Sequence, residues 1–421
     1  MAPRPPPSRR WLRWCGRVLL AALLLAVVAL AVYGWRSFPQ RSGSLHIAGL
    51  QQPVLVERDA ADLTHIRART QHDAFLAMGY VHAQERGWQL AFNRRLMHGR
   101  LSEILGPATL ETDKLLRTLG IARAAEQQLA GLPPEAQAAL QAYSDGINAF
   151  FSHSGQILPP EFLLLQATPG APGAAWAPAD SVAWALMMAL DLGGNWGNEF
   201  ARLSAAQVLD TGRLWQLFPP YPGEKPAARA DLAALYRGLG LYRNTESSKT
   251  GAIQPATALA SGPFDHELAT WAADFAAGLG SSEGKGSNSW AVAGSHTTSG
   301  KPLLANDPHL ALGAPALWYF AHLQAPAEQG APALDVVGAT LPGLPFVVLG
   351  RTPQVAWSFT NTGPDVQDLY IEQINPANPA QYRVPGAAGT PAWANFATRS
   401  ETIQVKGAPD VVLTVRATRH G

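Results

Sequence analysis

The stretch with the clearest capacity for chemistry spans residues 284–310 and reads GKGSNSWAVAGSHTTSGKPLLANDPHL. A serine hydroxyl such as that of Ser287 is a weak nucleophile until a base takes its proton. Cleavage between Gly286 and Ser287 would give Ser287 a free α-amino group, whose ordinary pKa of roughly 7.7 to 8.0 suits a base at neutral pH. One residue would then supply nucleophile and base, so the junction predicts a serine activated by chain cleavage.

Other catalytic patterns in the sequence are incomplete. Gly284-Lys285 lacks the earlier glycine and the following Ser or Thr of a P-loop, and no H-E-x-x-H zinc motif is present. A G-x-S-x-G pattern at 280–284 is the one feature that favours an exported serine hydrolase with a His-containing triad, but Ser282 has no strand before it and no helix after it. Cys15 is the only cysteine, which excludes an internal disulfide and a Cys-rich zinc site.

The charge of the chain argues against a nucleic-acid partner. Charged residues make up 15% of the sequence, and 32 Lys and Arg residues face 31 Asp and Glu residues. Five of those basic residues precede position 18, which leaves 27 basic groups against 31 acidic ones in the body. Nucleic-acid binding depends on clustered Lys and Arg that neutralise phosphates, so we expect no such partner.

A membrane-targeting segment lies near the N-terminus. Residues 18–34 read VLLAALLLAVVALAVYG without a charge, after five arginines and before Arg36 and Arg41. As a helix this segment can just span a bilayer as an uncleaved anchor, with the basic end in the cytoplasm. The alternative is a signal peptide cleaved at the small residues of Ala29-Leu30-Ala31. Both interpretations export the body, to the periplasm or the outer face of the inner membrane.

The elements that follow predict a mainly helical first half. Alternating apolar residues after Gln52 predict a β-hairpin that turns at Asp59 to Asp62. Thr70 and Asp73 form a capping-box start for an amphipathic helix whose apolar stripe includes Glu85. Because a buried lone carboxylate is costly, we expect Glu85 to pair with Arg94 or Arg95 in a structural role. More helical patterning covers Leu119 to Phe151 and Ser181 to Leu209.

The second half has the pattern of strands. Strands are predicted at Ser289 to Ala293, Pro302 to Ala305, Leu334 to Val337, Phe346 to Leu349, Val355 to Phe359 and Asp368 to Ile371. The segment between the two halves is rich in Gly and Ser, and this composition predicts a spacer. The expected organisation is therefore 1–40 basic terminus with anchor or signal, 41–243 helical region, 244–286 spacer and 287–421 strand-rich region.

Six stretches between Pro53 and the C-terminus share one resemblance: GYVHAQERGWQLAFNRRLMHGRLSEILG at 79–106, LPPEF at 158–162, GSNSW at 286–290, LANDPHL at 304–310, LPGLPFVVLG at 341–350 and AWSFTNTGPDVQDLYIE at 356–372. On these motifs the chain resembles the penicillin acylase family of N-terminal-nucleophile (Ntn) hydrolases. The resemblance implies an α+β fold with an αββα sandwich, and a precursor that cuts itself into an α chain, a spacer and a β chain beginning at Ser287. The chain stops at Gly421 where the family pattern normally continues, so we expect a truncated precursor with a partial sandwich.

The resemblance also implies roles for individual residues. Ser287 matches the nucleophile and base, and Gly286 the residue before the cut. Asn361 matches the position whose backbone N–H helps to form the oxyanion hole, and His309 matches a position near the nucleophile that is Gln in penicillin G acylases. His309 is equally interpretable as a hydrogen-bonded structural histidine. A structural Ca²⁺ site would use Glu199, Asp365, Gln367 (through its carbonyl) and Asp368.

Taken together, the sequence predicts an exported amidohydrolase that opens linear amides of N-acyl compounds after autoproteolysis at Gly286-Ser287. The candidate substrates are β-lactam side-chain amides, N-acyl-homoserine lactones and other N-acyl amino compounds. The mature form would be an α/β heterodimer with no organic cofactor, attached to the membrane through residues 18–34 if these are not removed. The alternative is a non-catalytic, envelope-anchored binding or scaffold protein that keeps the architecture without the chemistry.

Overall fold

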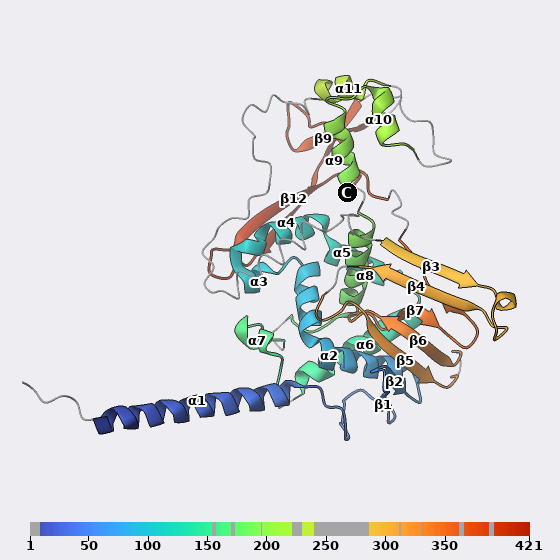
Figure 1. Cartoon of the computed structure of the whole chain (residues 1–421). Helices are drawn as coiled ribbons and strands as arrows, with labels where there is room; N and C mark the ends of the chain where they lie inside the picture. The colour runs from blue at the N-terminus through green and yellow to red at the C-terminus, as the bar shows by residue number, and fades with distance from the viewer. Residues whose placement is uncertain are drawn as a thin grey trace, which may run out of the picture.

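The computed structural model describes residues 9–153, 157–169, 173–194, 196–220, 230–239, 286–310, 313–328, 330–361, 366–386 and 391–421. Helices occupy the first half of the chain and strands the second (Figure 1). This mixed content of helix and sheet agrees with the predicted α+β class. The αββα sandwich and the four segment boundaries stay predictions. Of the predicted spacer, only Gly286 falls within the described residues.

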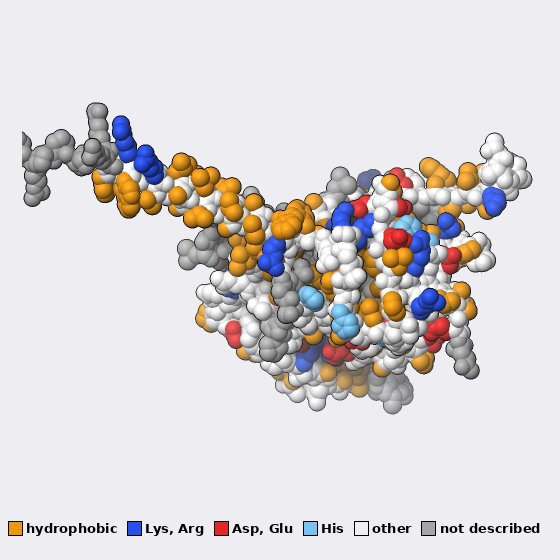
Figure 2. Space-filling view, turned by 90° about the horizontal axis from the view of Figure 1, so that it is seen from below, with side chains coloured by type: hydrophobic (Ala, Val, Ile, Leu, Met, Phe, Trp, Pro, Cys, Tyr) orange, Lys and Arg blue, Asp and Glu red, His pale blue; other side chains and the backbone are white. Residues whose placement is uncertain are grey.

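The N-terminal segment forms one long helix that stands away from the body. Helix α1 (Arg9–Ser37) contains the stretch Arg13–Ser37, which is long and apolar enough to cross a membrane and is not buried in the body. Figure 2 shows it as a projecting rod of hydrophobic side chains. Near its end the Tyr33 hydroxyl donates to the carbonyl of Leu158 at 2.8 Å. The helix is compatible with either an anchor or a signal segment.

The central sheet joins strands from both halves of the chain. Its order is β1 (Leu55–Arg58), β2 (Thr64–Arg67), β5 (Tyr319–Ala325), β6 (Leu334–Thr340), β7 (Val347–Arg351) and β8 (Ala356–Trp357). Strands β1 and β2 form the predicted hairpin, with Asp62 in the left-handed conformation at its turn. Only the β2–β5 pair of this sheet is parallel, and it connects the N-terminal hairpin to the strand-rich half.

Two long helices cross closely beneath the sheet because each contributes a glycine at the contact. Helix α2 (Gln71–Met97) starts at the predicted cap, where the Thr70 hydroxyl accepts from the Asp73 N–H at 3.0 Å. It crosses α6 (Pro134–Ser152), the continuation of the predicted helical pattern. A Cβ added to Gly79 would lie 2.0 Å from the carbonyl oxygen of Tyr143, and one added to Gly146 would lie 1.9 Å from that of Leu76. The two backbones therefore pack without side chains between them.

The other helices of the first half that the structure describes are shorter. They are α3 (Ser102–Leu105), the 3₁₀ helix η1 (Gly106–Thr109), α4 (Leu110–Leu119), α5 (Ile121–Leu129), α7 (Pro160–Leu164), α8 (Pro178–Leu192), α9 (Trp196–Ala205), α10 (Thr211–Leu217) and α11 (Leu232–Gly238). The last three lie beside β9 (Gln381–Pro385) at the end of the molecule away from α1 (Figure 1). The second predicted helical stretch corresponds to α8 and α9, with a break between them.

The predicted partner of Glu85 is wrong, although the expectation that its carboxylate is paired is confirmed. Glu85 forms an ion pair with Arg58 of β1, and it accepts from the Tyr319 hydroxyl at 3.0 Å. Residues nine or ten apart on a helix are separated by roughly 14 Å along its axis, so Arg94 and Arg95 are out of reach. Arg94 instead donates through Nε to the buried Asp180 of α8 at 2.7 Å.

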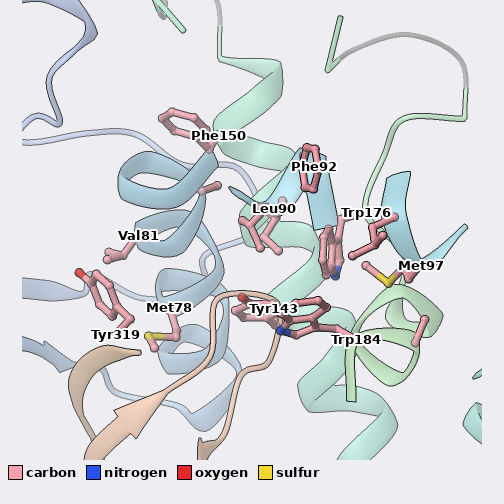
Figure 3. Close-up of a cluster of buried hydrophobic side chains, with 14 of the residues drawn as sticks. Met78, Val81, Leu90, Phe92, Met97, Tyr143, Phe150, Trp176, Trp184 and Tyr319 are labelled. Carbon is pink, nitrogen blue, oxygen red and sulfur yellow. The ribbon is translucent and has the colours of Figure 1, made fainter. Parts of the chain in front are cut away.

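A buried chain of hydrogen bonds connects the helical and strand-rich halves. Thr340 Oγ1 donates to the Tyr319 carbonyl at 2.7 Å, so it accepts from His82 Nε2 at 3.2 Å. His82 Nδ1 therefore accepts from the Tyr143 hydroxyl at 2.7 Å, and the N–H of Gly343 donates to that hydroxyl at 2.8 Å. Tyr143 lies against Trp184 in the surrounding apolar cluster (Figure 3). Burial and the charge of Arg86 lower the pKa of His82 from 6.5 to about 3, so its imidazole is neutral.

The rest of the strand-rich half forms three two-stranded sheets. They pair β3 (Gly286–Val292) with β4 (Leu303–His309), β9 (Gln381–Pro385) with β10 (Pro391–Asn395), and β11 (Ala397–Ile403) with β12 (Val411–Ala417). A short 3₁₀ turn, η2 (Gly294–His296), lies between β3 and β4. The strand predicted at Asp368 to Ile371 is wrong, because this segment has no neighbouring strand to share hydrogen bonds with and its side chains are exposed.

Candidate active site

The predicted cleavage junction lies at the start of the β3–β4 hairpin. Antiparallel pairing sets Gly286 opposite His309 and Ser287 opposite Pro308. Both junction residues are half-buried. A Cβ added to Gly286 would have His309 Nδ1 as its nearest neighbour, at 3.8 Å. The fold therefore brings the junction and the predicted His309 together from positions 22 residues apart.

The imidazole of His309 is held by a carboxylate that sequence reasoning missed. His309 Nε2 lies 3.0 Å from Oδ2 of Asp307, and both side chains are exposed. An ionised carboxylate only accepts, so Nε2 carries the proton and Nδ1 is left as the basic nitrogen. That nitrogen is the ring atom nearest Gly286. Residues two apart on a strand share a face. The D-x-H pattern would therefore have predicted this contact if the segment had been identified as a strand.

The segment that carries Asn361 is hydrogen-bonded to this hairpin. Ser289 Oγ lies 2.6 Å from Ser358 Oγ, and Asn306 Nδ2 donates to the carbonyl of Phe359 at 3.2 Å. Asn306 Nδ2 also donates to the carbonyl of Asn288 at 2.9 Å, which ties β4 to β3. Figure 1 shows the hairpin beside β7 of the central sheet. Asn361 is thereby tethered close to the junction strand, and sequence reasoning had not identified Asn306 as the link.

The side chain of Asn361 has a structural contact of its own. Its Nδ2 donates to the carbonyl of Leu192, at the C-terminus of α8, at 2.6 Å. The predicted oxyanion role requires only the backbone N–H of Asn361, so this contact leaves that role possible while fixing the segment against the helical half. At the same helix end, a Cβ added to Gly193 would lie 3.4 Å from Val366 Cγ2, so Val366 also lies near the end of α8.

The predicted calcium ligands do not form a metal site within the described part of the chain. Glu199 on α9 forms an ion pair with Arg202 at 3.0 Å. Gln367 is half-buried and Asp368 is exposed, whereas Asp365 falls outside the described residues. Among the residues that the structure describes, no three or more His, Cys, Asp or Glu side chains gather so as to hold a metal. Binding of calcium therefore stays a prediction.

A cavity of about 310 Å³ lies elsewhere, between α2, α3, α6 and the loop before α8. Arg94, Arg95 and Arg100 line it together with Glu103 and apolar side chains. None of the predicted catalytic residues borders it. The geometry of the hairpin is the better guide to the reaction, since a catalytic group must be within reach of the bond that it acts on.

Comparison with known proteins gives a consistent result. Residues 53–421 match the Penicillin amidase family. The chain is 33% identical over 425 residues to the acyl-homoserine lactone acylase QuiP of Pseudomonas aeruginosa, covering 99% of this chain and 46% of that protein. It is 33% identical over 387 residues to the penicillin acylase 2 proenzyme of Pseudomonas sp. strain SE83, covering 91% of this chain and 45% of that protein.

A more distant relative is the penicillin G acylase of Escherichia coli, at 27% identity over 405 residues and 87% of this chain. The chain spans about half the length of the curated relatives it matches. A solved structure of a thermostable penicillin G acylase from Alcaligenes faecalis matches at a TM-score of 0.35 with 22% identity, over 43% of this chain and 99% of that one.

Proposed function

The chain belongs to the penicillin amidase family, and on that premise we propose that the whole protein is an acylase that hydrolyses the linear amide bond of N-acyl compounds. The observation that carries the proposal is the Gly286-Ser287 junction with the basic nitrogen of His309 beside it. The names of the relatives, which are penicillin acylases and acyl-homoserine lactone acylases, support the same reaction class.

Maturation is the first use of Ser287. Its Oγ attacks the carbonyl carbon of Gly286, the C–N bond of that peptide breaks, and the released nitrogen gains a proton as an ester forms. Water then hydrolyses the ester, which leaves a Gly286 carboxylate and a Ser287 with a free amine and hydroxyl. Before the cut the nitrogen of Ser287 is an amide and is no base, so the proton of its hydroxyl needs another acceptor. Our candidate for that acceptor is His309, which is hydrogen-bonded to Asp307 and lies opposite Gly286 in the hairpin.

Hydrolysis of substrate uses the new N-terminus. Ser287 Oγ attacks the amide carbonyl, and the α-amine takes the hydroxyl proton and gives it to the departing nitrogen. Backbone N–H groups near Asn361 would stabilise the oxyanion, and one such donor typically contributes roughly 3 to 4 kcal/mol to the transition state. Water then releases the acyl group as a carboxylic acid and restores the serine.

The finer features of the proposal follow from the family and from α1. The mature enzyme would be an α/β heterodimer, and the N-terminal helix would direct its export. Asp365 would be one of the ligands of a structural calcium ion. The acyl group would occupy an apolar pocket. Both β-lactam side-chain amides and N-acyl-homoserine lactones remain candidate substrates, since relatives named for each match with equal identity.

The test is hydrolysis by the whole protein of a panel of phenylacetyl amides and of amides with C8 to C12 acyl chains, with the Ser287→Ala variant as the control. We expect turnover of at least one apolar acyl class, and none by the variant. A preference for charged acyl groups, or equal turnover by Ser287→Ala, would contradict the proposal.

A further inference from the structure

Two histidines from opposite ends of the sequence meet on the central sheet. His65 of β2 and His322 of β5 are direct partners in the parallel register. Their Nδ1 atoms lie 3.1 Å apart, and the rings meet edge to face with an interplanar angle of 69°. Each side chain is about one-fifth exposed, at 20% and 19%. The pair is thus accessible to a small solute but fixed by its strands.

A carboxylate binds the far nitrogen of each ring. His65 Nε2 lies 3.2 Å from Asp59 Oδ2, and His322 Nε2 lies 2.7 Å from Asp335 Oδ1. The hydrogen bond from His65 and those from backbone N–H groups lower the pKa of Asp59, so its carboxylate is ionised and only accepts. Because a carboxylate is an acceptor, the geometry assigns the ring proton of each histidine to the Nε2 that faces one. In their neutral forms both rings then present a bare lone pair at Nδ1.

Two lone pairs at 3.1 Å repel each other unless a cation lies between them. The surrounding charge also favours a cation. Asp59 and Asp335 contribute two negative charges, whereas Glu57 on β1 is neutralised by an ion pair with Arg67 on β2. On β5, Gln324 accepts from Arg67 Nε at 3.1 Å and adds no charge. At the hairpin turn, Asp62 pairs with Arg41 at 3.4 Å.

We propose that His65 and His322 bind a divalent transition-metal ion of the Zn²⁺ class through their two Nδ1 atoms. Zinc–nitrogen bonds of about 2.0 to 2.1 Å put two ligand nitrogens roughly 2.9 Å apart at a right angle and roughly 3.3 Å apart in a tetrahedron, which brackets the observed separation. Solvent completes the coordination, since no third His, Cys, Asp or Glu of the described residues joins the pair in a metal-binding group.

Asp59 and Asp335 act in this site as orienting groups. A metal-bound histidine almost always donates its other ring N–H to a carboxylate, carbonyl or water, which fixes the tautomer and raises ligand basicity. Both rings already have that partner here. The bound ion would join the N-terminal hairpin to a strand 257 residues further along the chain.

The proposal is tested by titrating untagged protein with Zn²⁺ in a calorimeter. We expect one saturable equivalent, at least tenfold weaker binding in His65→Gln and in His322→Gln, and binding weakened about 10- to 100-fold in Asp335→Asn. His72→Gln is the matched control, because His72 also lies beside a carboxylate, 3.3 Å from Asp73, but has no second histidine. That variant should bind Zn²⁺ like the wild type, and thermal unfolding confirms that each variant is folded.

X-ray absorption on the Zn²⁺-loaded wild type gives a second reading that does not depend on the variants. A spectrum that shows two imidazole ligands on Zn²⁺, with the remaining ligands being oxygen or nitrogen atoms, supports the site. The proposal is overturned by the absence of saturable Zn²⁺ binding, by a spectrum with fewer than two imidazoles, or by binding that survives both histidine substitutions. It is equally overturned if the pair shares one proton at neutral pH and Zn²⁺ does not displace it.

Discussion

At the scale of single residues, the pair Asp307 and His309 has the most direct consequence for maturation. The carboxylate of Asp307 keeps the proton on His309 Nε2 and so leaves Nδ1 basic beside Gly286. We expect Asp307→Asn to slow cleavage of the precursor roughly tenfold or more, since a positioned base typically contributes two to four powers of ten. The uncut fraction is followed over time on a denaturing gel.

His296→Gln is the control for that experiment, because His296 belongs to the turn η2 of the same hairpin. It should mature at the normal rate. Equal rates for Asp307→Asn and the wild type would remove His309 from the maturation step.

A second prediction at this scale concerns His82 and pH. Its folded pKa of about 3 is below its ordinary value of 6.5. Between these two values the unfolded chain binds more protons, so the free energy of unfolding falls as the pH is lowered through this range and is insensitive to His82 above it. From pH 6.5 to 5.0 this residue alone should cost roughly 1.5 kcal/mol. Urea denaturation at both pH values measures the loss.

The matched variant is His82→Gln, which is neutral at both pH values. It should be less stable overall, because the hydrogen bonds to Tyr143 and Thr340 change, but its loss between pH 6.5 and 5.0 should be smaller than that of the wild type. A loss of the same size in both proteins would show that His82 does not titrate on unfolding.

Individual residues differ in how far sequence could identify them. Ser287 could be proposed from the sequence because the chemistry proposed for it depends on one peptide bond, which is visible in the sequence. Asp307 is not, since its meaning depends on sharing a strand face with His309. The partner of Glu85 was wrong for a related reason: Arg58 comes from a strand that the sheet places over α2, and sequence distance gives no hint of that contact.

At the scale of elements, the crossing of α2 and α6 depends on two glycines. A methyl group at position 146 would meet the Leu76 carbonyl oxygen at 1.9 Å, and the backbone there cannot move aside as a flexible side chain could. We expect Gly146→Ala to lower the free energy of unfolding by at least about 2 kcal/mol, near or above the usual cost of overpacking. Urea denaturation at constant pH is the measurement.

Gly87→Ala on α2 is the matched control. Its Cβ would have the ring of Phe151 as nearest neighbour at 3.4 Å, which is ordinary contact. Because alanine favours a helix over glycine by up to about 1 kcal/mol, this variant should be as stable as the wild type or slightly more stable. If both substitutions destabilise equally, the close crossing is not what requires glycine.

Elements with local signals were predictable, whereas elements that depend on distant partners were less so. The hairpin at 55–67 and the N-cap at Thr70 follow from turn and capping residues, and both are confirmed. The predicted capping box is incomplete, because the carboxylate of Asp73 accepts from the N–H groups of Gln51 and Gln52. Strand β5 was missed although its side chains alternate in burial, and its parallel partner β2 is far away in the sequence. The strand at Asp368 to Ile371 had the apolar composition of a strand but found no neighbour.

At the scale of the whole molecule, α1 projects from the folded body, although Tyr33 near its end donates a hydrogen bond to the carbonyl of Leu158. The apolar stretch of α1 is not buried in the body, so deleting residues 1–40 should change the free energy of unfolding by no more than about 1.5 kcal/mol, the usual net contribution of a hydrogen bond. The same deletion should abolish export, because the basic flank and apolar helix are the proposed targeting signal. Cell fractionation and urea denaturation measure the two effects. An exported deletion variant, or a clearly destabilised one, would contradict this view.

The central claim is that Ser287 becomes a chain terminus. It is tested most directly by the intact mass and N-terminal sequence of the protein produced from its complete gene in an exporting host. We predict two chains, one of which begins Ser-Asn-Ser-Trp, and a single uncut chain for Ser287→Ala. A wild-type protein that remains one uncut chain, or a Ser287→Ala variant that is processed normally, would contradict the account.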